Sequence, residues 1–214
     1  MRNLLIIAIF IVPLTTIGQS NINVGKGLVK IEFEKLPTLL FYSDTNKTTP
    51  LRTVSVTKDK EGEFIIKNSS HVRSWFNPEG LWLDYGIFII RVDTVIGKWY
   101  RVFTNNDKGT TLWIKADSVN NFIKWQTFLV DETTSINIHQ DFDLEIKTEP
   151  SDEALTIKRI EETDCFEAIE IMGDWLRIKT NESFECNESK KPIKSGWIKW
   201  RRNNRLLINY GLGC

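Results

Sequence analysis

Short runs of β-branched and aromatic residues constrain the fold of this chain more than any other feature of its sequence. Examples are IFIIRV (87–92) and WLRIK (175–179), and polar turn segments such as NNDKG and NESFECNESKK separate such runs. Almost no segment shows the apolar spacing of an amphipathic helix. Short strands at this spacing favour small β-barrels or sandwiches, so we expect an all-β fold.

The composition excludes several classes of protein. The chain has 28 Lys and Arg against 28 Asp and Glu, so it lacks the broad basic field of a nucleic-acid-binding protein. Its two His and three Cys leave few ligands for a metal site, and we expect neither a metal nor another cofactor. A length of 214 residues suits one large domain or two small ones.

The first residues have the layout of a secretory signal peptide. Arg2 gives a positive start, 4–14 is an apolar run, and the small residues Thr16 and Gly18 suit a cleavage site before Gln19. A transmembrane anchor is the alternative, but the run is well short of the ~20 residues that span a bilayer. We therefore expect a cleaved signal peptide over residues 1–18. The mature chain is then exported, periplasmic or extracellular, without stable membrane insertion and without a nucleic-acid partner.

A duplicated motif divides the mature chain into two halves. IGKWYRV (96–102) aligns with MGDWLRI (172–178), and LWIK (112–115) aligns with GWIK (196–199). Glycine can adopt the positive φ of a tight hairpin turn, and large aromatic residues can fill a small core. We therefore interpret the repeated residues as a structural motif: Gly97, Trp99, Trp113, Gly173, Trp175, Gly196 and Trp197.

This pattern resembles the bacterial SH3-like (SH3b) domain family. In the second half the resemblance covers 144–160, GDWLRIKT and SGWIKW. The first half matches more weakly, because Leu112 replaces the glycine before the second Trp and an insertion occupies about 57–85. The resemblance implies two small SH3-like barrels in tandem, a divergent one over 19–131 and a second over 132–214. A single larger β-sandwich is the rival architecture.

Resemblance to SH3b domains also implies recognition of peptides or peptidoglycan. The sequence contains no G-x-S-x-G, H-E-x-x-H, P-loop or G-x-G-x-x-G motif, and neither His71 nor His139 has a recognisable catalytic partner. We therefore expect a non-catalytic, exported binding module for a peptide or cell-wall ligand. The alternative is a structural protein that docks onto another exported protein.

Four aromatic residues outside the repeat are the candidate ligand-binding residues. The insertion carries most of them around the turn 77–80, where they could stack on a ligand or pack onto the seam between domains. The last lies in the basic segment 190–205, which could also face an anionic partner or balance the acidic residues of that half. These candidates are Trp75, Trp82, Tyr85 and Trp200.

All three cysteines lie in the second half. An exported protein can keep disulfides, so one pair and one free thiol are expected. A hairpin centred on Gly173 makes Cys165–Cys186 plausible, and Cys186–Cys214 is the alternative.

Overall fold

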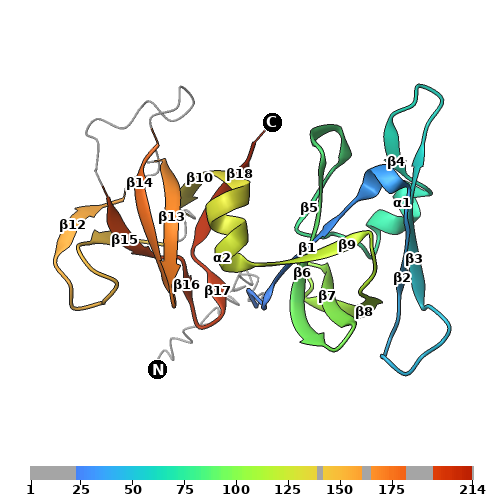
Figure 1. Ribbon diagram of the computed structural model, residues 1–214, viewed down its shortest axis with the longest axis horizontal. Coiled ribbons are helices and arrows are strands. Elements are labelled where there is room, and N and C mark those ends of the chain that lie inside the picture. The colour runs from blue at the N-terminus through green and yellow to red at the C-terminus, as the bar shows by residue number, and fades with distance from the viewer. Residues whose placement is uncertain (1–22, 139–141, 161–164, 182–194, 214) are drawn as a thin grey trace, which may run out of the picture.

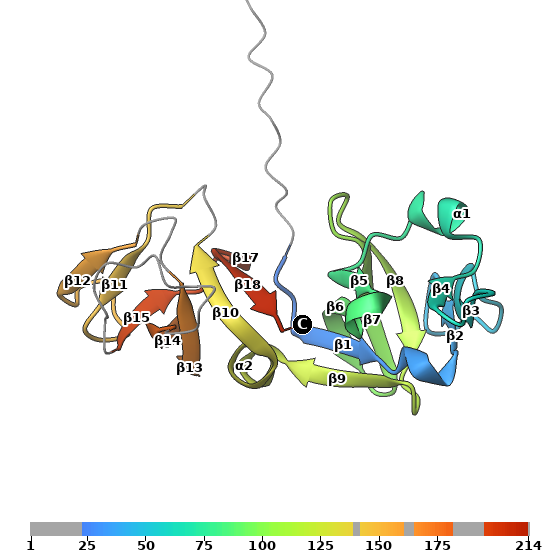
Figure 2. The same ribbon diagram turned by 90° about the horizontal axis from the view of Figure 1, so that it is seen from above.

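The computed structural model describes residues 23–138, 142–160, 165–181 and 195–213. These residues form eighteen strands and a few short helical turns, which confirms the predicted all-β class. The strands gather in two lobes that lie side by side (Figures 1 and 2). The first lobe holds β1–β9 and the second holds β10–β18.

A six-stranded antiparallel sheet forms the centre of the first lobe. Its order is β8–β7–β6–β1–β9, and β5 also pairs with β6. The strands are β1 (Gly27–Ile31), β5 (Gly80–Trp82), β6 (Ile87–Ile96), β7 (Trp99–Asn105), β8 (Thr110–Lys115) and β9 (Asn120–Lys124).

A three-stranded antiparallel sheet completes the first lobe. It has the order β2 (Thr38–Phe41), β3 (Arg52–Lys58) and β4 (Phe64–Ile66). Three short helical elements connect the strands: η1 (Phe33–Lys35), α1 (Ser69–Arg73) and η2 (Leu83–Tyr85). The insertion therefore contributes β4, α1, β5 and η2. Its Phe76 packs edge-on against Phe41 and Phe88, with ring centroids 5.5 and 6.1 Å apart, so the insertion is part of the core of this lobe.

A seven-stranded sheet forms the second lobe, in the order β12–β11–β15–β14–β13–β10–β18. Its strands are β10 (Thr133–Ile138), β11 (Glu145–Lys147), β12 (Thr156–Arg159), β13 (Phe166–Met172), β14 (Trp175–Thr180), β15 (Gly196–Lys199) and β18 (Ile208–Leu212). A small hairpin of β16 (Arg201–Arg202) and β17 (Arg205–Leu206) lies between β15 and β18.

The two sheets share a strand order and a register. The path β8–β7–β6–β1–β9 has its counterpart in β15–β14–β13–β10–β18. Trp99 lies opposite Lys115, as Trp175 lies opposite Lys199. The turn before each of these tryptophans contains a glycine at positive φ, 56° at Gly97 and 60° at Gly173. The aligned residues of the two sequence motifs therefore occupy corresponding positions in their sheets.

The expected barrels are not closed. Among the described residues, no backbone pairing joins β8 to β9 or β12 to β18, so both sheets have free edges. In the first lobe β3 pairs with β4 of the insertion, and only the bridge between Tyr42 and Trp113 links this three-stranded sheet to β8.

The lobes are joined by a short helical link that contributes to the core. It consists of α2 (Trp125–Thr127) and the π-helical turn η3 (Phe128–Glu132), and α2 lies between the lobes in Figure 1. Trp125 Nε1 donates a hydrogen bond to the Val24 carbonyl at 3.0 Å, and the Val24 amide donates to the Asn204 carbonyl at 2.6 Å. Leu28 belongs to the same apolar cluster as the second-lobe core, so this apolar cluster contains residues of both lobes.

Candidate functional site

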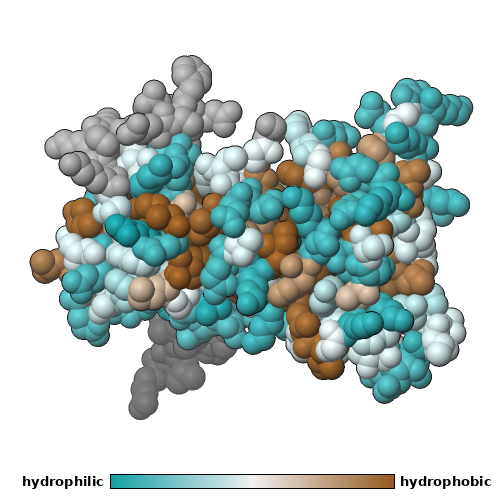
Figure 3. Space-filling view, viewed as in Figure 1, coloured by the Kyte–Doolittle hydropathy of each residue, from teal (hydrophilic) through white to brown (hydrophobic). Residues whose placement is uncertain are grey.

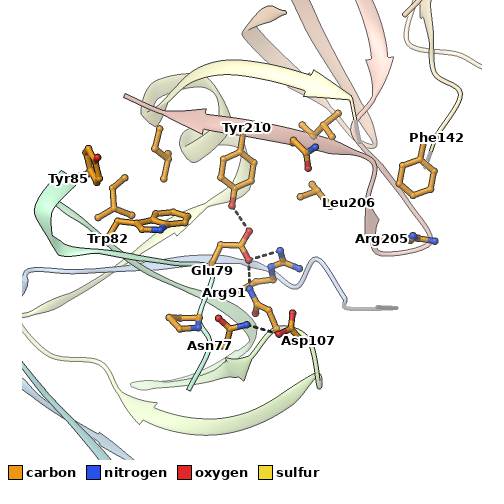
Figure 4. A pocket seen from close by; sticks show the side chains of 16 residues that line it. Asn77, Glu79, Trp82, Tyr85, Arg91, Asp107, Phe142, Arg205, Leu206 and Tyr210 are labelled. Carbon is orange, nitrogen blue, oxygen red and sulfur yellow. Dashed lines mark hydrogen bonds and ion pairs between the residues drawn. The ribbon is translucent and has the colours of Figure 1, made fainter. Parts of the chain in front are cut away.

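A groove of about 780 Å³ lies between the lobes. We call it the interlobe groove. The insertion forms one side of it and the end of the second lobe forms the other (Figure 4). On the face drawn in Figure 3, apolar residues form separate patches on both lobes rather than one continuous surface. The principal lining residues are Glu79, Trp82 and Tyr85 on one side and Arg205, Leu206 and Tyr210 on the other.

The Glu79 carboxylate is the centre of a buried polar network in this groove. Its side chain is 8% exposed and pairs with Arg91, whose side chain is 9% exposed, at 2.5 Å between Oε2 and a terminal guanidinium nitrogen. Asn106 Nδ2 donates to the same oxygen at 2.6 Å, and the Tyr210 hydroxyl donates to Oε1. The Arg91 guanidinium also lies 5.9 Å from the centroid of the Trp125 ring. The buried charge of Glu79 is therefore paired and hydrogen-bonded, as a buried carboxylate requires.

Tyr210 connects the second lobe to this network. Burial raises the pKa of its phenol well above the usual value, and the negative charge of Glu79 and its hydrogen bond act in the same direction. The phenol is therefore held in its protonated form, in which it can donate to Glu79. The ring packs edge-on against Phe128 at 5.1 Å, so its position is also set by the link between the lobes.

Hydrogen bonds from the β7–β8 loop hold the insertion turn in place. Asn77 Nδ2 donates to Asp107 Oδ2 at 2.7 Å, and the Asn77 amide donates to the Thr104 carbonyl at 2.8 Å. The Asn106 amide in turn donates to the Asn77 carbonyl at 2.9 Å. This pairing fixes the turn that presents Glu79 to the groove (Figure 4).

Two buried polar atoms of the network have no hydrogen-bond partner within the described residues. They are Nε of Arg91, a donor, and Oδ1 of Asn106, an acceptor. Both side chains line the groove. Because buried polar groups are nearly always satisfied in folded proteins, these two atoms are exceptions within the buried network.

Two of the predicted ligand-binding residues meet at the rim of the groove. Trp82 ends β5 and is 52% exposed, and Tyr85 ends η2 and is 61% exposed. Both rings therefore present accessible surface at the rim, where a ligand could contact them. The insertion thus packs into the core of the first lobe through Phe76 and leaves Trp82 and Tyr85 exposed.

The structure places Trp75 and Trp200 away from this rim. Trp75 is half-buried against Phe41, at 5.6 Å between ring centroids, with the Arg52 guanidinium 5.9 Å from its ring. Trp200 is 1% exposed, and its Nε1 donates to the Gly173 carbonyl at 3.1 Å. Trp200 is therefore inaccessible to a ligand in this conformation, and Trp75 belongs to another face of the first lobe.

The repeated tryptophans are less buried than their structural interpretation suggests. Trp99, Trp113 and Trp175 are half-buried, and only Trp197 of the four is buried, at 9% exposed. Trp125 and Trp200, which lie outside the motif, are almost fully buried. Successive side chains of a strand point to opposite faces of the sheet. Trp175 therefore points away from the core, and its neighbours along the strand take the buried positions. Cationic side chains cover the outward rings, Lys199 over Trp175 at 5.3 Å and Arg101 over Trp113 at 5.7 Å.

Sequence reasoning did not find the residues of the polar network. Arg91 carried a usable signal, because it is the one charged residue in the apolar run IFIIRV. Glu79, Asn106 and Tyr210 lie in polar turns or in a short terminal strand, where nothing in the sequence distinguishes them. Glu79 and Asn106 meet within the first lobe, and Tyr210 joins them only because the two lobes pack.

The remaining predictions about the site concern cysteines, metals and membranes. Cys165, directly before β13, is 6% exposed, while Cys186 and Cys214 lie outside the described residues, so the disulfide stays a prediction. Within the described ranges, no three His, Cys, Asp or Glu side chains form a group that could hold a metal ion. Over the same ranges, no helix has the length and apolar character needed to cross a bilayer.

The sequence matches no protein-family model and has no significant match among curated proteins.

Proposed function

We propose that this protein is an exported, non-catalytic binding module built from two SH3-like units, and that the interlobe groove receives a cell-wall ligand. The observation that carries the proposal is the pair of exposed aromatic residues, Trp82 and Tyr85, at the rim of a groove with a charged but neutralised floor. A concave site lined by aromatic and apolar residues, with a few placed polar groups, is the usual form of a ligand site.

Three features support the SH3-like interpretation. The two sheets share the strand order given above, and the aligned Gly–Trp motifs share a register. Each unit also carries a bulge at the same distance before its hairpin turn, between Val92 and Thr94 and between Ala168 and Glu170. Export follows from the signal-peptide layout of residues 1–18, and peptidoglycan or its peptides are the ligands that the SH3b resemblance implies.

Retention on purified peptidoglycan tests the proposal. The exported chain should be retained, and replacing both Trp82 and Tyr85 by Ala should reduce retention at least about tenfold, because a buried aromatic anchor often contributes 2 kcal/mol or more to binding. Met172→Ala is the matched control, since Met172 is 57% exposed at a hairpin tip and does not line the groove. Absence of retention, or equal losses in both variants, would count against the proposal.

Docking onto another exported protein is the second candidate function. Leu155 is 78% exposed and Ile157 46% exposed on or beside β12, an edge strand of the second sheet. Edge strands with apolar side chains can pair with another chain. This candidate makes two predictions. The unsubstituted chain is not retained on peptidoglycan, and Leu155→Glu abolishes co-purification of the partner protein.

A further inference from the structure

A second cavity, of about 390 Å³, lies on the face of the first lobe that carries Trp75. We call it the basic pocket. Its walls come from β3 and from the segment that leads from the end of β4 into α1, and they carry Arg52, Lys67 and the imidazole of His71. Within the described ranges, no Asp or Glu lines it. The basic pocket therefore concentrates positive charge, although the formal net charge of the whole chain is zero.

Strand pairing brings the two permanent cations of the basic pocket to the same cavity. The Lys67 backbone N–H donates to the Ser55 carbonyl at 2.9 Å, which extends the pairing of β3 with β4 by one residue. Arg52 lies three residues before Ser55 on β3, so roughly 10 Å along the strand separates Arg52 from the level of Lys67. Two long side chains at this separation can converge on one anion, and both line the cavity.

The charges of the basic pocket are not neutralised by any described residue. Arg52, Lys67 and His71 are exposed, and their side chains form neither an ion pair nor a hydrogen bond within the part of the chain that the structure describes. The Arg52 guanidinium lies over the Trp75 ring, 5.9 Å from its centroid, and Trp75 packs against Phe41 at 5.6 Å. The ring thus supports the guanidinium and leaves its N–H groups available to a ligand.

The donors of the basic pocket match a phosphate monoester better than a carboxylate. A phosphate monoester carries about two negative charges at neutral pH and three acceptor oxygens. Arg52 and Lys67 match this charge, and the Thr53 hydroxyl and the Asn68 amide add neutral donors to the lining. A carboxylate carries a single charge, so it would leave one of the two cations unmatched.

We propose that the basic pocket binds a phosphate monoester, with the phosphoryl oxygens accepting hydrogen bonds from Arg52 and Lys67. The cavity is larger than a phosphate group, and Pro50 and Leu51 add apolar surface to its wall, where the organic part of the ester lies. This site goes beyond the proposed function, because the basic pocket and the interlobe groove share no lining residue.

Titration calorimetry with three matched sugars tests the ligand class. Glucose 1-phosphate, glucuronate and glucose share a pyranose ring and carry a phosphate monoester, a carboxylate and no charge. At pH 7 and constant ionic strength, glucose 1-phosphate should bind at least about tenfold more tightly than glucuronate, since one further hydrogen bond between charged groups accounts for roughly that factor. Glucose should not bind measurably. Equal affinity for glucose 1-phosphate and glucuronate overturns the phosphate assignment.

Variants with matched controls connect the binding to the pocket. Arg52→Gln should weaken glucose 1-phosphate binding at least about tenfold. Arg73→Gln, an equal loss of charge at an exposed α1 residue outside the lining, should weaken it less than about threefold. Lys67→Gln against Lys60→Gln repeats the comparison if Arg52→Gln does not fold, as judged by circular dichroism. Equal losses in a folded variant and its control overturn the site.

Vesicles distinguish a soluble ester from a lipid headgroup. Phosphatidic acid presents a phosphate monoester on phosphatidylcholine vesicles, and phosphatidylglycerol presents a diester as the control. Binding of glucose 1-phosphate assigns a soluble ester, and binding of phosphatidic acid vesicles alone assigns a lipid headgroup. Binding of neither ligand overturns the proposal.

The interlobe groove gives the last control. Replacing both Trp82 and Tyr85 by Ala should leave glucose 1-phosphate binding unchanged, because neither residue lines the basic pocket. A loss of phosphate binding in a folded form of that variant would overturn the basic pocket as the site. Loss of peptidoglycan retention in the same variant, with phosphate binding intact, keeps the two sites separate.

Discussion

The hydrogen bond from Tyr210 to Glu79 joins the two lobes. Removing the hydroxyl oxygen of Tyr210 measures how much this bond contributes to stability. Tyr210→Phe deletes the hydroxyl and keeps the ring packed against Phe128. A hydrogen bond to a charged group contributes about 1.5–3 kcal/mol. Glu79 keeps two partners, Arg91 and Asn106, on its other oxygen. We therefore expect a loss near the middle of that range, about 2 kcal/mol in the free energy of unfolding.

Urea unfolding at pH 7, followed by tryptophan fluorescence, measures this loss. Tyr85→Phe is the matched control, because it makes the same chemical change at a side chain that is 61% exposed. The control should change the free energy of unfolding by less than about 0.5 kcal/mol. A loss below that value for Tyr210→Phe would refute the view that this bond holds the lobes together.

The same residue predicts how stability depends on pH. The pKa of Tyr210 is raised in the folded state, so the unfolded chain loses this proton first, at about pH 10. The contribution of the protonated phenol is therefore complete below about pH 10 and declines as the pH rises further. Between pH 9 and pH 11 the unsubstituted chain should lose stability more steeply than Tyr210→Phe. Parallel curves would contradict the assignment.

Three further predictions concern the core, the floor of the groove and the cysteines. Gly196→Ala should lower the free energy of unfolding by about 1–3 kcal/mol, because the added Cβ would lie 2.2 Å from Cγ2 of Ile146; an unchanged urea midpoint would contradict this. Arg91→Met should cost about 3–5 kcal/mol, because it leaves the buried charge of Glu79 without its cationic partner. Arg159→Met, at a side chain 70% exposed, should cost less than about 1 kcal/mol, and similar losses in the two variants would refute the distinction. Alkylation and mass measurement of the unreduced, denatured chain should label one of three cysteines; three labels would exclude a disulfide.

The sequence predicted the repeated parts of the fold well because local rules determine them. A glycine at positive φ followed by Trp and alternating apolar residues specifies a hairpin and its register, and the structure has this arrangement at Gly97 and Gly173. The strands β10 and β18 were harder to recognise. TTSINI has only two apolar residues, and the pairing of β10 with β18 joins segments that lie far apart in the sequence.

The candidate site could be predicted only in part. Trp82 and Tyr85 stood out as aromatic residues in an insertion that the repeat did not explain, and they reach the same rim. The polar floor was not predictable, because Glu79 and Tyr210 are far apart in the sequence and meet only when the lobes pack. Sequence patterns describe single strands and turns, whereas this network depends on tertiary contacts.

Hydrogen–deuterium exchange with and without soluble peptidoglycan fragments tests most directly whether the interlobe groove is the ligand site. The proposal predicts slower exchange in two separate segments, 77–85 of the insertion and 206–212 of the second lobe, with the hairpin tip around Met172 unchanged. Protection confined to β12 or to that hairpin tip, with no change in the two groove segments, would contradict it.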